Sequence, residues 1–115
     1  MDKVGQPYSA GDWTVKAGQE AEFVERWSAF TKWSADNVPG AESFLLIQAQ
    51  DNPRHFVSVG GWRDMESLQA WRQLPEFQQL FSRCRELCDE MDGTNYTLRS
   101  MQTPQLVPSP LAGEG

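Results

Sequence analysis

Residues 43–62, SFLLIQAQDNPRHFVSVGGW, define the centre of the fold. Residues 43–50 are bulky and nearly continuously apolar, which is typical of a strand covered on both faces. Residues 51–54 have the composition of a turn, and residues 55–62 return as an apolar partner strand, so the stretch predicts a β-hairpin. Gly60 and Gly61 remove side-chain bulk from the second strand, where a bulge, a helix or a ligand can approach.

Upstream of the hairpin, the pattern predicts a strand and then a helix. Residues 8–16 alternate loosely, with Trp13 and Val15 on one side. Large side chains then recur every three or four positions, as on one face of a helix, until residues 37–40, Asn-Val-Pro-Gly, end it. The members of this helical face are Phe23, Trp27, Phe30 and Ser34.

Downstream of the hairpin, the pattern predicts two helices and a last strand. Asp64 is predicted to be the N-cap of a short helix, and Pro75 fits the first position of the next one. We expect the second helix to continue to Met91, with Gly93 after it, and residues 95–101 to form the closing strand. The short helix carries Met65, Leu68 and Trp71, and the long one carries Phe77, Leu80, Phe81, Cys84, Leu87, Cys88 and Met91.

This order of elements predicts a single α+β domain of the ferredoxin-like βαββαβ type. We expect a four-stranded antiparallel sheet with helices on one face only. A homodimer, with the sheets of two copies facing each other in an α+β barrel, would cover the other face. The domain would span residues 8–101, after a lead-in of residues 1–7. Residues 102–115 hold three prolines and two glycines, and we interpret them as a flexible tail or an arm over a neighbour.

Composition limits the classes of partner. The chain has 115 residues, 10 basic and 16 acidic, for a net charge of −6. Nucleic acid is an unsuitable partner, because phosphate contacts need a basic patch. No run reaches the roughly 18 apolar residues of a membrane span, and the N-terminus has no apolar signal segment, so we expect a cytoplasmic protein.

The sequence contains few candidates for catalytic or metal-binding residues. Cys84 and Cys88 are four positions apart and are best explained as reduced thiols packed as small hydrophobes. The chain has one histidine, so no metal site and no cofactor are expected. His55, at a strand end, is either a solvated or structurally bonded imidazole or a general base. Trp62 ends a strand before a helix, where it serves the core or lines a pocket.

The remaining candidates divide into aromatic and polar groups. Trp27, Phe30, Trp71 and Phe81 lie on helical stripes, where core packing competes with ligand contact as their role. Polar side chains that point inward from a strand need a partner, and such groups can bind a ligand. The candidates by strand position are Asp12, Gln48, Ser58 and Tyr96, and the competing explanation for each is an ordinary surface or sheet-face group.

Two segments of the chain together form a recognisable pattern. The first holds Trp13-Thr14-Val15-Lys16-Ala17-Gly18, Glu22-Phe23 and Trp27, and the second holds Phe56-Val57-Ser58-Val59-Gly60-Gly61-Trp62, Glu66-Ser67-Leu68, Ala70-Trp71 and Leu74-Pro75-Glu76-Phe77. From about Ser9 to Met101 the chain resembles the antibiotic biosynthesis monooxygenase (ABM) superfamily. The resemblance implies a dimeric ferredoxin-like barrel that binds a small hydrophobic molecule. Some members oxygenate anthrone-like or quinol-like aromatics with molecular oxygen and neither metal nor flavin, and others bind and degrade haem.

The chain departs from both branches of this family at polar positions. Trp62 matches the pocket tryptophan of the two branches. The haem branch has a histidine near Phe81 and an asparagine near Gly11, so the resemblance argues against haem ligation. The polyketide branch has an asparagine, a tyrosine and an arginine where this chain has about Ser58, Leu68 and Phe81.

The sequence and the resemblance leave three hypotheses for the function. The first is a cofactor-independent monooxygenase, with Trp62, Trp27, Phe30, Phe81 and Trp71 as apolar walls and Ser58, His55 or Tyr96 acting on a phenol. The second is a non-catalytic module that binds a lipophilic ligand or is filled by its own aromatic side chains. The third, haem binding or breakdown, is the least supported.

Overall fold

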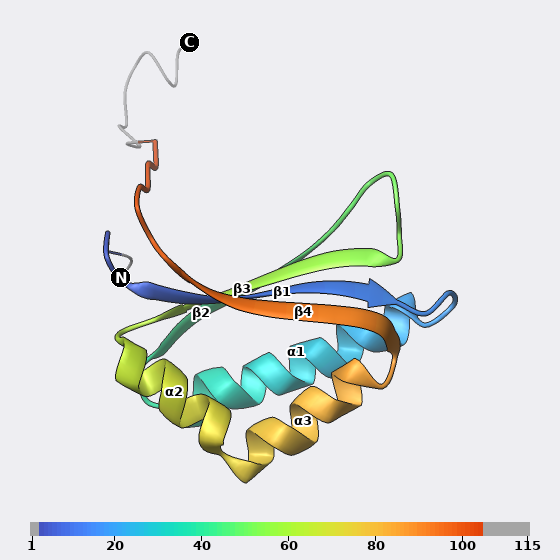
Figure 1. Cartoon of the computed structure of the whole chain (residues 1–115), viewed down its shortest axis with the longest axis horizontal. Helices are drawn as coiled ribbons and strands as arrows, with labels where there is room; N and C mark the ends of the chain where they lie inside the picture. The colour runs from blue at the N-terminus through green and yellow to red at the C-terminus, as the bar shows by residue number, and fades with distance from the viewer. Residues whose placement is uncertain (1–2, 105–115) are drawn as a thin grey trace, which may run out of the picture.

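The computed structural model describes residues 3–104, which form four strands and three helices (Figure 1). The order of elements matches the predicted strand, helix, hairpin, two helices and strand. Their bounds are β1 Pro7–Val15, α1 Glu20–Asn37, β2 Ala41–Gln48, β3 His55–Trp62, α2 Met65–Gln73, α3 Pro75–Arg85 and β4 Cys88–Thr97.

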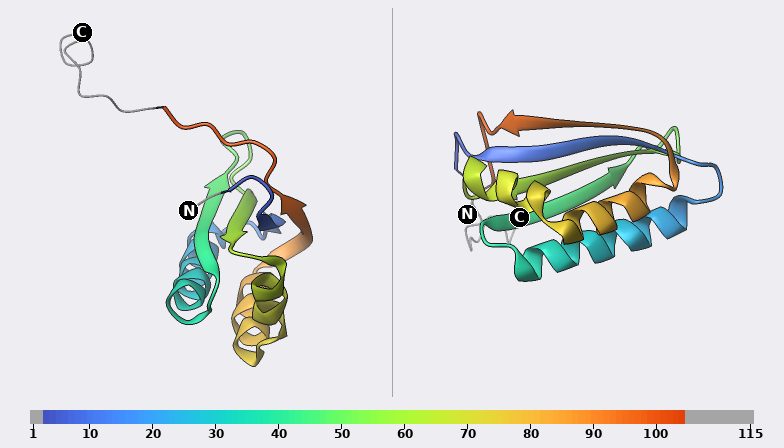
Figure 2. Two further views of the ribbon diagram at one scale, coloured as in Figure 1. Left: turned by 90° about the vertical axis from the view of Figure 1, so that its left-hand side faces the viewer. Right: turned by 60° about the horizontal axis from the view of Figure 1, so that its bottom comes forward.

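The four strands form one antiparallel sheet in the order β2-β3-β1-β4. All three helices pack against the same face of the sheet, and the other face is open (Figure 2). The predicted ferredoxin-like α+β fold is therefore confirmed.

The core lies between the sheet and the helices because apolar residues alternate on the central strands. Trp13 and Val15 of β1, and Phe56 and Trp62 of β3, are buried on the helix-facing side. The predicted stripe of α1 meets them, and the rings of Phe23 and Phe56 are 5.1 Å apart.

Three local signals set the helix ends as predicted. Gly40 follows α1 with φ +88°, and a Cβ there would lie 2.2 Å from Ser67 Oγ, so glycine is required on two grounds. The Asp64 carboxylate caps α2 by accepting a 2.8 Å hydrogen bond from the Ser67 amide. Pro75 is the first residue of α3.

The predicted end of the second helix and start of the last strand are wrong. α3 ends at Arg85, and β4 begins at Cys88 rather than at residue 95. β1 presents a full row of backbone groups at its free edge, and β4 pairs with it from Cys88, opposite Val15, to Thr97, opposite Pro7. A helix continued to Met91 would leave part of this edge unpaired. Gly93, expected to follow the helix, lies within β4 opposite Gly11.

The open face of the sheet carries exposed apolar side chains. Leu45 and Ile47 of β2 are 61% and 63% exposed, so β2 is covered on one face only within a single chain. Cover by a second copy remains a prediction. The predicted tail lies outside the described residues except for residues 102–104. Between residues 3 and 104, no helix combines the length and apolar character that crossing a membrane requires.

Candidate functional site

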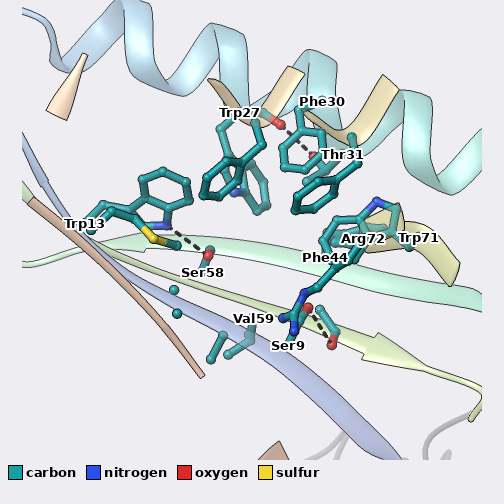
Figure 3. A pocket seen from close by; sticks show the side chains of 17 residues that line it. Ser9, Trp13, Trp27, Phe30, Thr31, Phe44, Ser58, Val59, Trp71 and Arg72 are labelled. Carbon is teal, nitrogen blue, oxygen red and sulfur yellow. Dashed lines mark hydrogen bonds between the residues drawn. The ribbon is translucent and has the colours of Figure 1, made fainter. Parts of the chain in front are cut away.

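A cavity of about 310 Å³ lies between the sheet and the helices (Figure 3). The helices supply its roof, and β1 and β3 supply most of its floor. Ligand sites commonly span about 300–1,000 Å³, so this cavity fits a small molecule.

Aromatic rings from all three helices form the roof. Phe30 of α1 stacks on Trp71 of α2, with ring centroids 5.6 Å apart and planes 10° apart. Phe77 and Phe81 of α3 stack in the same way at 5.3 Å. These residues recur at helical spacing and therefore project from one side of each helix. The rings form an apolar roof suited to contact with an aromatic ligand.

Small residues keep the floor low beneath these rings. Gly11 of β1 and Gly60 of β3 both line the cavity. A Cβ on Gly11 would lie 2.8 Å from Trp13 Nε1 and 2.9 Å from Ser58 Oγ. A larger residue would have to displace these groups, so glycine preserves the space above the sheet.

Three buried tryptophans donate their indole N–H to serine hydroxyls, which fixes the walls of the site. The pairs are Trp13 with Ser58 at 3.0 Å, Trp62 with Ser9 at 3.2 Å, and Trp71 with Ser34 at 2.9 Å. A buried indole N–H requires such an acceptor.

Two neutral donors that line the cavity are uncommitted within residues 3–104. Ser58 accepts the Trp13 bond, but its own hydroxyl proton has no acceptor in that range. The Trp27 N–H also has no acceptor there. Every fully enclosed side-chain nitrogen or oxygen of the described residues has a partner, so the Trp27 nitrogen keeps access to the cavity or to solvent.

Arg72 is the charged residue of the cavity wall. Its side chain leaves α2, is partly buried, and extends across the cavity toward the strands (Figure 3). Its Cζ lies 6.0 Å from the centre of the Trp71 ring. Burial lowers the pKa of the guanidinium, which nevertheless stays cationic at neutral pH. Among the described residues it has neither an ion pair nor a side-chain hydrogen bond.

The cavity collects five of the eight residues to which the monooxygenase hypothesis assigns a role: Ser58, Trp27, Phe30, Trp71 and Phe81. Trp62 lies beside it but does not line it. Its side chain is fully buried, and its ring is 4.7 Å from that of Trp71.

The other two candidates lie on the open face of the sheet. His55 Nε2 is 2.9 Å from Asp12 Oδ1, and both side chains are exposed. Tyr96 of β4 is 59% exposed. Because successive residues of a strand point to opposite faces, His55 and Ser58 cannot serve the same cavity within one chain.

Sequence reasoning missed Arg72, Trp13 and Phe77 as cavity residues. The sequence pattern marks Trp13 and Phe77 as apolar positions, but the spacing of apolar residues cannot distinguish a core position from a cavity wall. Arg72 follows Trp71 in a polar stretch of α2 and resembles a solvated helix residue. Its long side chain crosses apolar surface to reach the cavity, which no local pattern indicates.

The two buried thiols stay protonated at neutral pH, and the described part of the chain forms no metal-binding cluster. Burial raises the pKa of the Cys84 thiol to about 12 and also raises that of Cys88, so both are protonated at neutral pH. In residues 3–104, no group of three or more histidine, cysteine, aspartate or glutamate side chains is arranged to hold a metal ion.

The comparisons with known proteins agree with this architecture. The family model described as "Antibiotic biosynthesis monooxygenase" matches residues 10–83. A comparison with curated protein sequences gives no match.

Several solved structures share the fold. A mutant of SnoaB, a cofactor-independent oxygenase from Streptomyces nogalater, superimposes with a TM-score of 0.77 at 21% identity, covering 92% of this chain and 100% of that one. A conserved protein from Methanosarcina mazei Go1 gives 0.74 at 18% identity, covering 84% and 95%. At these identities the likeness extends to the fold alone.

Proposed function

Because this chain belongs to the antibiotic biosynthesis monooxygenase family, we propose that it is a cofactor-independent monooxygenase that oxidises a small hydrophobic aromatic molecule. The observation that carries the proposal is the cavity, where aromatic rings surround a few uncommitted hydrogen-bond donors. The similarity in fold to SnoaB, which is named a cofactor-independent oxygenase, supports the same activity class.

The cavity residues divide into two roles in this proposal. Phe30, Trp71 and Phe81 pack against the faces of the substrate and exclude water from it. Ser58 and Trp27 donate hydrogen bonds to a substrate oxygen. Fixed donors in an apolar cavity stabilise negative charge that develops on such an oxygen more strongly than water does.

The reaction follows from the electron-rich ring itself. Loss of a proton from a phenol or enol raises the electron density of the ring, so that it can reduce molecular oxygen. For a substrate with a reactive methylene carbon, two C–H bonds break and a C=O bond forms. One oxygen atom enters the product, and the other leaves as water with both hydrogens, so atoms and electrons balance.

The direct test is oxygen consumption with anthrone as the substrate. We expect the protein to accelerate oxygen uptake and the conversion of the anthrone methylene carbon to a carbonyl in air, with one atom of ¹⁸O incorporated from ¹⁸O₂. Ser58→Ala should lower kcat/KM about tenfold to a hundredfold, since a donor to the developing anion is lost. Ser28→Ala, at an exposed position of α1, is the matched control. Equal rates with and without the protein would refute the proposal.

A binding module without catalysis is the second candidate. The observation that favours it is that neither a carboxylate nor a histidine lines the cavity, so no side chain there acts as a strong base. This alternative predicts saturable quenching of tryptophan fluorescence by anthrone without any increase in oxygen uptake. Haem binding has less support, because the one histidine, His55, lies on the opposite face, and an unchanged Soret band on haem addition would exclude it.

We also propose that two copies associate through the open face of the sheet. Leu45 and Ile47 expose apolar surface there, and a second copy would bury it. Light scattering should give the mass of a dimer at micromolar concentration, and Ile47→Lys should shift it toward the monomer. Gln50→Lys, an exposed position just after β2, is the control. A wild-type monomer would contradict the proposal.

A further inference from the structure

We propose that the cavity binds its aromatic ligand as an anion, with Arg72 as the residue that sets this specificity. The inference deepens the proposed function, because it assigns the charge of the ligand in the same cavity.

The hydroxyls of Thr31 and Ser9 cannot donate to a ligand, because their protons are already used within the protein. Thr31 Oγ1 donates to the Trp27 carbonyl oxygen at 2.9 Å. Ser9 Oγ accepts from Trp62 and donates to the Gly60 carbonyl oxygen at 3.5 Å. This leaves Ser58, Trp27 and Arg72 as the lining side chains that can donate a hydrogen bond to a ligand.

The three available groups are all donors. Trp27 N–H and the Arg72 guanidinium have no acceptor capacity, and the Ser58 oxygen already accepts from Trp13. No aspartate or glutamate lines the cavity to offset the positive charge. A negatively charged oxygen of a ligand can accept a hydrogen bond from each of these donors, whereas a cationic group can accept from none of them.

The environment of Arg72 adds to this selectivity. A partly buried guanidinium beside aromatic rings has lost some of its hydration, and the described residues supply no carboxylate in return. An anionic ligand restores that interaction, and charge-assisted bonds are stronger than neutral ones. Asp64, the carboxylate that caps the N-terminus of α2, is occupied by Arg63 and by the Ser67 amide.

This charge preference explains how the site can work without a base. Binding the anion in preference to the neutral acid lowers the pKa of a bound phenol or enol. The ionised, electron-rich form is then the bound form, and the proton is released to solvent. The expected ligand class is therefore a planar aromatic with one acidic oxygen group at its edge.

The test is equilibrium binding under anaerobic conditions, followed by quenching of tryptophan fluorescence. The first pair of probes is 2-naphthoate and its neutral isostere 2-naphthamide. The second pair is 4-nitrophenol, at a pH where it is ionised, and 4-nitroanisole, which cannot ionise. We expect the anion of at least one pair to bind about 10- to 100-fold more tightly than its neutral partner. The pair that shows the preference distinguishes a carboxylate ligand from a phenolate.

Variants assign the preference to Arg72. Arg72→Gln should abolish it, and Arg72→Lys should retain part of it, because the charge remains but the planar fork is lost. Arg83→Gln, at an exposed position of α3 outside the cavity, makes the same change in net charge and should retain it fully. Far-ultraviolet circular dichroism verifies that each variant is folded.

Several results would overturn the inference. These are equal or tighter binding of both neutral probes, an unchanged preference in Arg72→Gln, or no binding of any probe at millimolar concentration. Oxygen plays no part in this assay. Lost preference with intact oxygenation of anthrone would thus refute this inference alone, and retained preference without oxygenation would refute the proposed function alone.

Discussion

Replacing Ser34 by alanine is expected to destabilise the domain, although only one oxygen atom is removed. Ser34 is fully buried in α1, and its hydroxyl accepts a 2.9 Å hydrogen bond from the indole N–H of Trp71 in α2. This bond joins two of the three helices that roof the cavity. Without it, the Trp71 donor is buried with no acceptor.

The magnitude follows from two opposing terms. An unsatisfied buried donor costs about 1–3 kcal/mol. Alanine in place of serine inside a helix returns about 0.5 kcal/mol through its higher propensity. We therefore expect a net loss of about 0.5–2.5 kcal/mol in the free energy of unfolding. In a domain of this size, 1 kcal/mol corresponds to about 4 °C, so Tm should decrease by about 2–10 °C.

Urea unfolding followed by circular dichroism measures this loss. Ser28→Ala is the matched control, because Ser28 is an exposed serine of the same helix. Trp71→Phe, introduced into the wild type and into Ser34→Ala, isolates the pairwise term. It should cost about 1 kcal/mol less in the Ser34→Ala background, where the N–H is already unpaired. Equal costs in the two backgrounds, or a Ser34→Ala variant as stable as Ser28→Ala, would refute the reasoning.

The remaining predictions concern backbone geometry and titration. Gly40→Ala should destabilise the domain by more than Gly18→Ala in urea unfolding, because both glycines have positive φ but only a Cβ at Gly40 meets Ser67; equal losses would contradict this. Stability should fall as pH rises from about 9 toward about 12, because the unfolded Cys84 thiol ionises first, and Cys84→Ala should flatten this decline. Hydrogen bonds from Ser67 lower the pKa of Asp64 to about 2, so its contribution is present above pH 3.8 and is lost as pH falls toward 2; an unchanged acid profile in Asp64→Asn would count against it.

The accuracy of prediction along this chain depends on the range of the interactions involved. The hairpin, the α1 stripe, the Asp64 cap and Pro75 are signals within a few residues, and the structure agrees with each. The end of α3 depends instead on β1, some 70 residues earlier. The spacing of Cys84, Leu87, Cys88 and Met91 suits a helix, but the free edge of β1 recruits residues 88–97 as a strand. Backbone pairing with the distant edge of β1 outweighs the local helical spacing of apolar residues.

The cavity residues show the same division between local sequence signals and long-range contacts. Helical stripes predicted Trp27, Phe30, Trp71 and Phe81 as a group, because periodicity reports which side of a helix is apolar. Periodicity does not report which polar group will be free after packing. Trp62 is committed to Ser9, and His55 pairs with Asp12 on the other face. Arg72 reaches the cavity with neither an ion pair nor a side-chain hydrogen bond in the described range.

The order of elements, the ferredoxin-like topology and the aromatic character of the interior follow from local patterns in the chain. These properties depend on spacing and residue type over short segments. The boundary between α3 and β4, the three indole–serine pairs and the set of free donors required the folded arrangement. Each depends on which group from a distant segment packs against a given atom. Contacts between segments far apart in the chain produce no periodic pattern in the sequence.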